Sequence, residues 1–272
     1  MSSNKTFLVD SVGAWLRLGF VLVLSVVVGV GMWSVVVILP TVQLDLGITR
    51  GQASLPYVAT MIGYGLGGVV FGRFSDRYGI HRTVVIGIVL MSLGYVTAAF
   101  APNLGFLSLS QGLLIGVGTS TTFAPLIAHV SLWFERRKGA AVGIVASGQY
   151  LSGAIWPTIL ESAVKGYGWQ HTYMLVGIVI LLMALPLSMV LSQRPSNVEG
   201  GVDAPVESLP SKLTISRSWF MALLMISVFS CCIAMSMPQV HLVAFCGDLG
   251  FGEGTGAKML SVMLGFGVVS RL

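Results

Sequence analysis

The sequence predicts an all-α polytopic membrane protein, and three observations carry this prediction. Of its 272 residues, 55% are hydrophobic and only 9% are charged, which leaves too little polar surface to cover a soluble globule. The mean hydropathy is +0.88, and the 34 glycines suit helices that approach one another closely within lipid. Seven apolar stretches are each long enough to cross about 30 Å of hydrocarbon, and an eighth begins near the end of the sequence.

The eight stretches follow one another at short intervals. The first follows Lys5 and Arg17 and is too long for the apolar core of a signal peptide, so we expect this helix to stay in the product. The last is still apolar at Leu272, so we expect either a partial sequence or a natural truncation. The expected spans cover residues 18–39, 53–72, 83–101, 104–128, 139–160, 172–191 and 219 to about 245, with the eighth beginning at 256.

The basic residues predict the orientation in the membrane. Eleven lysines and arginines fall on one side of the expected spans and three on the other, and positive side chains collect in cytoplasmic loops. We therefore expect a cytoplasmic N-terminus in a plasma membrane, such as a bacterial inner membrane. The eleven are Lys5, Arg17, Arg73, Arg77, Arg82, Arg136, Arg137, Lys138, Arg194, Lys212 and Arg217, and the three are Arg50, Lys165 and Lys258.

A long polar connection divides the chain. Residues 193–217 contain three prolines and a pair of glycines, which is typical of a linker between domains. We predict an N-terminal six-helix bundle over residues 1–192 and a cytoplasmic linker over residues 193–217. An incomplete C-terminal bundle, made of helix seven and part of helix eight, would cover residues 218–272.

Several function classes are excluded. Cys231, Cys232 and Cys246 have no metal-binding spacing, so we expect no metal and no cofactor. The net charge of +5 is divided into short clusters between apolar runs, which indicates topology and no nucleic-acid partner. Residues 63–68 match GxGxxG inside an apolar helix with no strand before it, so the glycine pairs 63/67 and 68/72 predict close helix crossing. No pattern predicts an enzyme.

An internal repeat gives the clearest sign of the architecture. Residues 45–47 (DLG) recur as residues 248–250, at an offset of 203. Residues 61–65 (MIGYG) recur as residues 263–267 (MLGFG), at an offset of 202. Two repeated halves that start on the same side of the membrane are typical of secondary transporters with a midplane site. If both halves are equal in length, about four more helices follow residue 272.

The loop between the second and third spans carries a family motif. Residues 72–82 read GRFSDRYGIHR, which resembles the GxLxDRxGxxR loop of the major facilitator superfamily, with Phe74 in place of the leucine. The resemblance implies a major facilitator fold over nearly the whole chain, made of the N-terminal six-helix half, helix seven and part of helix eight. It also implies a role for this loop in gating.

Three residues of this loop have a physical reason to act in gating. Asp76 would pair with basic groups or a helix N-terminus in one conformation, Gly79 would permit a tight turn, and Gly72 would let the helix end approach a neighbour. The alternative is that the arginines only fix topology. The gating residues implied by the resemblance are Gly72, Asp76, Arg77, Gly79, Arg82, Arg136 and Arg137.

A second group of motifs comprises the WFERRK run at 133–138, Ala141, Gly143, Ser147, Gly148, the GWQ triplet at 168–170, and Asp10, Ala14 and Trp15. These residues are similar to motifs of the monocarboxylate-porter branch, which also contains oxalate/formate exchangers. The similarity implies small organic anions as substrates, with a proton or a counter-anion as a coupled partner.

Polar residues within the spans predict a substrate site. Arg271 lies about fifteen residues, or roughly 22 Å, into the eighth stretch, where an unpaired charge is costly. It aligns with an arginine that attracts the substrate carboxylate in the resembled porters, and a guanidinium group suits bidentate binding. We expect Gln149, Tyr150 and Thr122 to line the same cavity. The alternatives are a snorkelling role for Arg271 and helix packing for the polar residues.

Together these features predict a secondary active transporter of small organic anions that works by alternating access in a lipid bilayer. Three alternatives stay open: a major facilitator transporter of another solute such as a drug or sugar, a seven-helix receptor, and an inactive truncated fragment. A retinal-binding receptor needs a Schiff-base lysine in helix seven, and residues 219–245 contain none.

Overall fold

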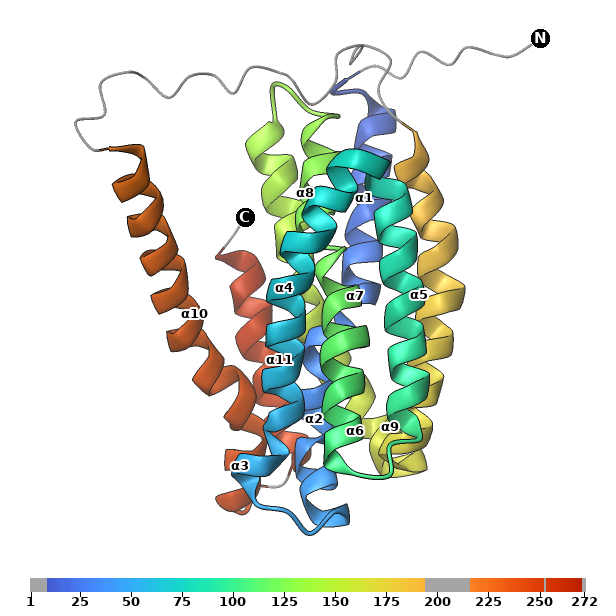
Figure 1. Ribbon diagram of the computed structural model, residues 1–272, viewed down its shortest axis with the longest axis vertical. Coiled ribbons are helices and arrows are strands. Elements are labelled where there is room, and N and C mark those ends of the chain that lie inside the picture. The colour runs from blue at the N-terminus through green and yellow to red at the C-terminus, as the bar shows by residue number, and fades with distance from the viewer. Residues whose placement is uncertain (1–8, 194–215, 252, 271–272) are drawn as a thin grey trace.

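The computed structural model describes residues 9–193, 216–251 and 253–270, and every regular element in these ranges is helical. Figure 1 shows long helices running side by side, with α10 leaning away from the others at one end. The elements are α1 (Val12–Val28), α2 (Val30–Asp45), α3 (Arg50–Ala53), α4 (Leu55–Tyr78), α5 (Ile80–Ala99), α6 (Leu104–Leu109), the π-helical turn η1 (Ser110–Gly116), α7 (Val117–Ser120), α8 (Ala124–Ser131), α9 (Lys138–Ser188), the short 3₁₀ turn η2 (Met189–Ser192), α10 (Arg217–Asp248) and α11 (Glu253–Val269).

The helical spans confirm the all-α membrane fold. Within the described residues, six helices are long and apolar enough to cross a membrane, and residues 254–269 form a shorter apolar helix. The expected first span, residues 18–39, lies within a longer helical stretch, Val12–Asp45, which is formed by α1 and α2. A helix continues beyond the hydrocarbon as long as its backbone hydrogen bonds are made, so apolar length alone does not give its ends.

The longest helix, α9, supplies two of the expected spans. Gly168 has φ 79° and ψ 163°, a positive-φ backbone that favours glycine, and it interrupts the helix. Figure 1 shows that α9 folds back on itself at one end of the bundle. Trp169, next to Gly168, is buried and donates a hydrogen bond from Nε1 to Oδ2 of Asp45 at 2.8 Å. This contact ties the turn within α9 to the end of α2.

The bundle has two ends that differ in charge. We call the end of the bundle with most arginines the basic end, at the top of Figure 1, and the opposite end the far end. The far end holds the end of α2, the helix α3, the turn in α9, and the junction of α10 with α11. The described cations of the basic end are Arg17, Arg73, Arg77, Arg82, Arg136, Arg137 and Lys138.

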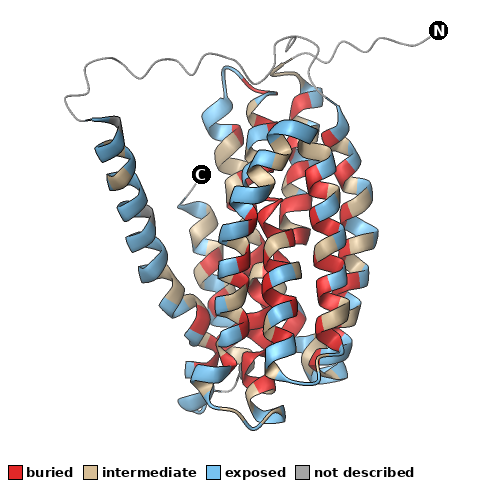
Figure 2. Cartoon of the chain, in the orientation of Figure 1, coloured by how far each residue is buried: buried red, intermediate tan, exposed pale blue. Residues whose placement is uncertain are grey.

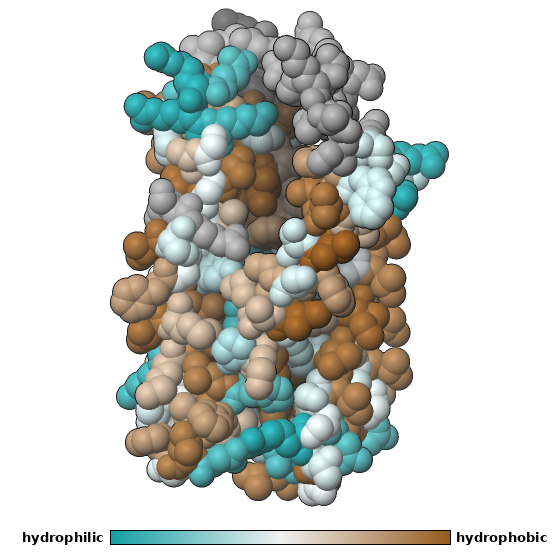
Figure 3. Space-filling model, turned by 90° about the vertical axis from the view of Figure 1, so that its left-hand side faces the viewer, coloured by the Kyte–Doolittle hydropathy of each residue, from teal (hydrophilic) through white to brown (hydrophobic). Residues whose placement is uncertain are grey.

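The surface between the two ends is apolar, as a lipid-facing surface requires. Figure 3 shows mainly hydrophobic residues along the middle of the molecule, while hydrophilic residues gather towards its two ends. Large hydrophobic side chains such as Leu66, Leu113 and Leu182 are exposed on the outside of the bundle. In water such a surface would promote aggregation, whereas in a bilayer it contacts lipid tails.

Close approach of α4 to η1 and α7 confirms one of the two predicted glycine crossings. A methyl group added at Gly63 would collide with the carbonyl of Gly112, and one at Gly67 would lie 2.6 Å from Oγ of Ser120. The second pair behaves differently, because a methyl group at Gly68 or at Gly72 would meet no atom within 4 Å. In this conformation Gly72 makes no such close approach, and its gating role stays a prediction.

Hydroxyl groups in α7 and at its C-cap fit against other glycines of the bundle. A side chain at Gly31 would collide with Oγ1 of Thr119, and one at Gly87 would collide with Oγ1 of Thr121. Thr119 also donates its hydroxyl to the carbonyl of Ile115 at 2.7 Å. These residues therefore pack helices together and satisfy their own polar groups within the helix.

A buried polar network joins four helical elements of the N-terminal half: α2, α5, η1 and α9. The hydroxyls of Ser34 and Tyr95 lie 2.7 Å apart, and Tyr95 donates to the carbonyl of Val30. Gln111 donates from Nε2 to the hydroxyl of Tyr173 at 2.7 Å, and the two tyrosine rings meet edge to face. Because lipid offers no hydrogen bonds, buried partners of this kind fix the helices in one arrangement.

The internal repeat has the same backbone structure in both copies. Gly47 and Gly250 each adopt positive φ, at 60° and 80°, directly after the helices that end at Asp45 and Asp248. Three backbone hydrogen bonds that close the turn after Asp45 recur at equivalent residues after Asp248. These turns resemble a Schellman-type helix end, which requires a left-handed residue. The structural match supports a true repeat.

We predict that Gly63→Ala destabilises the bundle by about 1–3 kcal/mol, because the added methyl group must push α4 away from η1. The matched control is Gly65→Ala on the same helix, where a methyl group meets open space. Apparent melting temperatures in detergent would measure both. Equal melting temperatures for the two variants would contradict this account of the crossing.

Candidate functional site

The described part of the C-terminal half contacts the N-terminal half mainly through α11 and the far end of α10. Along α11, the side chain of Leu264 covers Gly153 of α9, and the hydroxyls of Thr158 and Ser261 lie 3.1 Å apart. In α10 the buried apolar residues all lie near its end, while most of the helix is exposed (Figure 2). These four residues are Val240, Val243, Ala244 and Cys246.

This arrangement leaves the basic end more open than the far end. Figure 1 shows α10 approaching the other helices at the far end and diverging from them towards the basic end. Figure 3, which faces this side of the molecule, shows the surface hollowed in its upper half. The side chains that face this region from the N-terminal half are therefore candidates for contact with a solute.

Gln149 and Tyr150 lie where the two halves meet. Trp33 of α2 donates from Nε1 to the backbone carbonyl of Gln149 at 3.2 Å, which fixes α9 against α2 at this point. The ring of Tyr150 covers Gly267 of α11, and its hydroxyl donates to Sδ of Met235 in α10 at 3.9 Å. Tyr150 therefore contacts the C-terminal half, and Gln149 is its neighbour in the chain.

The side-chain amide of Gln149 has unused hydrogen-bonding capacity. Its Nε2 atom is buried and has no hydrogen-bond partner among the described residues. A buried N–H group without a partner is costly, so the amide is ready to donate to an acceptor that enters the site.

The other two predicted substrate-binding residues have different positions. Thr122 is only 1% exposed, and its hydroxyl donates to the carbonyl of Thr119 at 2.8 Å, so it lies in the packed interior of the N-terminal half. Arg271 lies outside the described residues. Four positions before it, Gly267 lies against Tyr150. The role of Thr122 and Arg271 in substrate binding stays a prediction.

The predicted gating residues are grouped at the basic end. Gly79, with φ 89°, forms the whole connection between α4 and α5, as expected for a tight turn. Asp76 and Arg82 are exposed, and within the described ranges no ion pair involves Asp76. Arg77 lies over the ring of Tyr78 at 5.5 Å. Asp76 is therefore free to pair when the neighbouring helices move, and its gating role stays a prediction.

Arg136 and Arg137, exposed in the loop before α9, lie next to a contact between two of the family-like motifs. Asp10 accepts hydrogen bonds at Oδ2 from the backbone N–H groups of Glu135 and Arg136, at 3.3 and 3.1 Å. Its own N–H donates to the carbonyl of Trp133 at 3.1 Å. The N-terminal motif thus anchors the loop that precedes α9.

Aromatic and cationic side chains complete this contact. The rings of Trp15 and Phe134 meet edge to face at 5.0 Å, and the guanidinium of Arg17 lies 4.3 Å from the ring centre of Trp133. Arg17 also donates to the carbonyl of Val190 and to Oε1 of Gln193. The start of α1, the loop before α9 and the end of η2 are therefore held together at the basic end.

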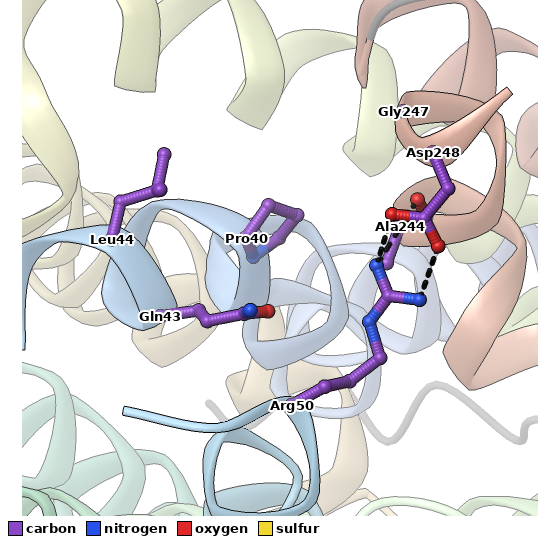
Figure 4. Close-up of a pocket in the computed structure, with 7 residues that line it drawn as sticks. All are labelled: Pro40, Gln43, Leu44, Arg50, Ala244, Gly247 and Asp248. Carbon is purple, nitrogen blue, oxygen red and sulfur yellow. Dashed lines mark hydrogen bonds and ion pairs between the residues drawn. The ribbon is translucent and has the colours of Figure 1, made fainter. Parts of the chain in front are cut away.

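An ion pair at the far end joins the two halves, and sequence reasoning missed it. Figure 4 shows Arg50 of α3 making two hydrogen bonds to the carboxylate of Asp248 at the end of α10. The Nη2 to Oδ1 distance is 2.8 Å. The repeat indicates Asp248, whereas the charge pattern gives Arg50 a role in topology only. A separation of 198 residues left no local signal for the pair.

Two cavities flank this junction. One of about 350 Å³ is lined by Arg50, Asp248 and five neighbours from α2 and α10 (Figure 4). The other, of about 220 Å³, lies between α2, α9 and α10 and includes Val37, Glu161 and Val243. In the parts of the chain that the structure describes, no group of three or more His, Cys, Asp or Glu residues could hold a metal ion.

The fold and this junction define the class of protein: an integral membrane protein with repeated helical halves that meet around polar residues. Residues 21–272 match the model of the Major Facilitator Superfamily. The chain therefore belongs to the major facilitator superfamily, whose members are membrane transporters of small molecules.

Individual relatives are consistent with the branch suggested by the motifs. The chain is 32% identical to monocarboxylate transporter 13 of Bos taurus over 76% of its own length and 47% of that protein. It is 32% identical to monocarboxylate transporter 11 of Homo sapiens over 73% of its length and 42% of that protein. It is 29% identical to the MFS-type transporter pytF of Aspergillus terreus, over 76% and 69%. The chain spans about half the length of the two monocarboxylate transporters.

We predict that Asp10→Ala lowers the free energy of unfolding by about 1 kcal/mol, because the backbone N–H groups of Glu135 and Arg136 lose their acceptor. The control is Asp10→Asn, which keeps an acceptor oxygen and tolerates the positive φ of 58° at this position. Apparent melting temperatures would compare them. Equal melting temperatures for Asp10→Ala and Asp10→Asn would show that the hydrogen bonds of Asp10 to the loop before α9 do not stabilise the protein.

Proposed function

We propose that this protein is a secondary active transporter of small organic anions, such as monocarboxylates or oxalate- and formate-like anions, that works by alternating access. The observation that carries the proposal is the position of Gln149 and Tyr150 at the junction of the halves, in a chain 32% identical to two monocarboxylate transporters. A site at the junction can be exposed to either side of the membrane when the halves rock.

The chemistry of the junction favours an anion. The amide of Gln149 offers an N–H donor, and Trp33 and Tyr150 provide apolar rings beside it. A short monocarboxylate with an alkyl group presents oxygen acceptors at one end and an apolar group at the other, which matches this pairing. Arg271 would supply the positive charge, and a guanidinium group binds a carboxylate through two hydrogen bonds.

We infer that the basic end faces the cytoplasm and that the residues from Gly72 to Arg82 gate that side. The excess of arginine and lysine at the basic end supports this orientation. In this proposal Asp76 pairs with a cation of the neighbouring loops when the cytoplasmic side closes. A coupled proton or counter-anion would complete the cycle.

We predict that Arg271→Ala lowers the uptake of a radiolabelled monocarboxylate into proteoliposomes at least about tenfold, because the carboxylate loses a charge-assisted bidentate contact. Arg271→Lys should retain part of the uptake, since the charge stays and the fork geometry is lost. Uptake rates over a range of substrate concentrations would separate binding from turnover.

The matched control is Lys258→Ala, which removes an exposed cation from the other end of the same apolar segment. Its uptake should equal that of the unmodified protein. Folding would be checked for each variant by size-exclusion chromatography. If the protein transports a drug or a sugar instead, uptake of that neutral solute would persist in Arg271→Ala, and unlabelled monocarboxylates would not compete with it.

A further inference from the structure

The far end of the molecule holds the charged contact between its halves. Arg50 binds Asp248 through both of its terminal nitrogens, and Nη2 also donates to the carbonyl of Ala244 at 3.4 Å. A guanidinium group that contacts both a side chain and the last turn of α10 fixes the orientation of that helix end. Two parallel hydrogen bonds also make this pair more specific than a single charge contact.

Local structure holds Arg50 in position. It is the first residue of α3, which is capped by Thr49: the Thr49 hydroxyl accepts from the N–H of Gln52, and Gln52 accepts from the N–H of Thr49. This reciprocal cap fixes the direction in which the chain leaves the turn after α2. The arginine therefore extends from a defined point of the N-terminal half towards α10.

The two copies of the repeat use their aspartates differently. Asp45 accepts a hydrogen bond from Trp169, so its carboxylate ties together elements within the N-terminal half. Asp248, at the equivalent position, binds Arg50 of the other half. The turns around both residues have the same backbone hydrogen bonds. The second copy thus has the same local structure, but its carboxylate bridges the halves.

The two ends of α10 differ in burial, and this difference suggests a role for the ion pair between Arg50 and Asp248. Beside Asp248, Val243 and Ala244 are buried against other helices, whereas Trp219 and Phe229 nearer the basic end are more than 60% exposed. α10 therefore contacts the N-terminal half at the far end and diverges from it towards the basic end (Figures 1 and 2). The ion pair lies on the closed side.

We propose that Arg50 and Asp248 form a latch that holds the far end closed while the basic end is open, and that the latch opens in each transport cycle. This inference rests on the proposed function, because only a transporter needs both states. The side chains of Arg50 and Asp248 are 38% and 53% exposed, and an ion pair this open to water has a small net free energy. Such a contact biases the conformation without locking it.

The test measures closure directly, without any substrate. Val37 is 5% exposed and lines the 220 Å³ cavity between the halves, so a cysteine at this position reports opening of the far end. Val37→Cys would be made in a protein whose three native cysteines are replaced by alanine. A membrane-impermeant maleimide would then be added to oriented membrane vesicles that expose the far end, and the labelling rate would be followed by mass spectrometry.

Charge reversal should speed this labelling. We expect Arg50→Glu, or Asp248→Arg, to raise the rate about three- to tenfold, because attraction is replaced by repulsion and the open state becomes more populated. The combined exchange Arg50→Glu with Asp248→Arg should restore slow labelling. Lys258→Glu, which reverses an exposed charge on α11, is the matched control and should leave the rate unchanged.

A second control calibrates the reagent. Phe100 is 68% exposed just after α5, at the far end, so Phe100→Cys should be labelled equally fast in every background. Equal Val37→Cys labelling in the single reversals and the unmodified pair would overturn the latch, and so would faster labelling that the exchange fails to reverse. A failure of the proposed function would be seen separately. The unmodified protein would then show no uptake of monocarboxylates, while the labelling rates of Val37→Cys would still follow the expected pattern.

Discussion

A bilayer offers no hydrogen bonds to the protein backbone, and this constraint shapes the whole molecule. Every described regular element is helical, which satisfies backbone groups within each segment. Helices in lipid gain little from hydrophobic burial, so they must be held together by close packing and by internal polar contacts. Gly63 against Gly112, and Tyr95 and Tyr173 with their hydrogen-bond partners, supply these two kinds of contact in the N-terminal half.

The same constraint explains why the motifs lie at the ends of the helices. Charged and polar groups are tolerated where the chain leaves the hydrocarbon, and there they can tie loops together. At the basic end Asp10 binds the backbone before α9, and at the far end Trp169 binds Asp45. Both contacts join segments more than 120 residues apart. These contacts therefore hold the loops at both ends of the bundle in fixed positions.

The sequence predicted the helical class, the order of the spans and the repeat, because apolar length and self-similarity are local properties of a chain. It placed Gln149 and Tyr150 in a polar region of a span, and the structure brings them to the junction. Helix ends were less predictable, because a helix such as Val12–Asp45 extends beyond its apolar core. The Arg50–Asp248 pair and the burial of Thr122 depend on which helices become neighbours, which no local pattern records.

The central claim is that the two halves meet at the far end and separate at the basic end. Double electron–electron resonance tests it with spin labels at exposed positions: Leu44 and Phe251 at the far end, and Tyr78 and Trp219 at the basic end. In the absence of substrate, the account predicts a short, narrow distance distribution for the far-end pair and a longer one for the basic-end pair. A long, broad distribution at the far end together with a short one at the basic end would contradict it.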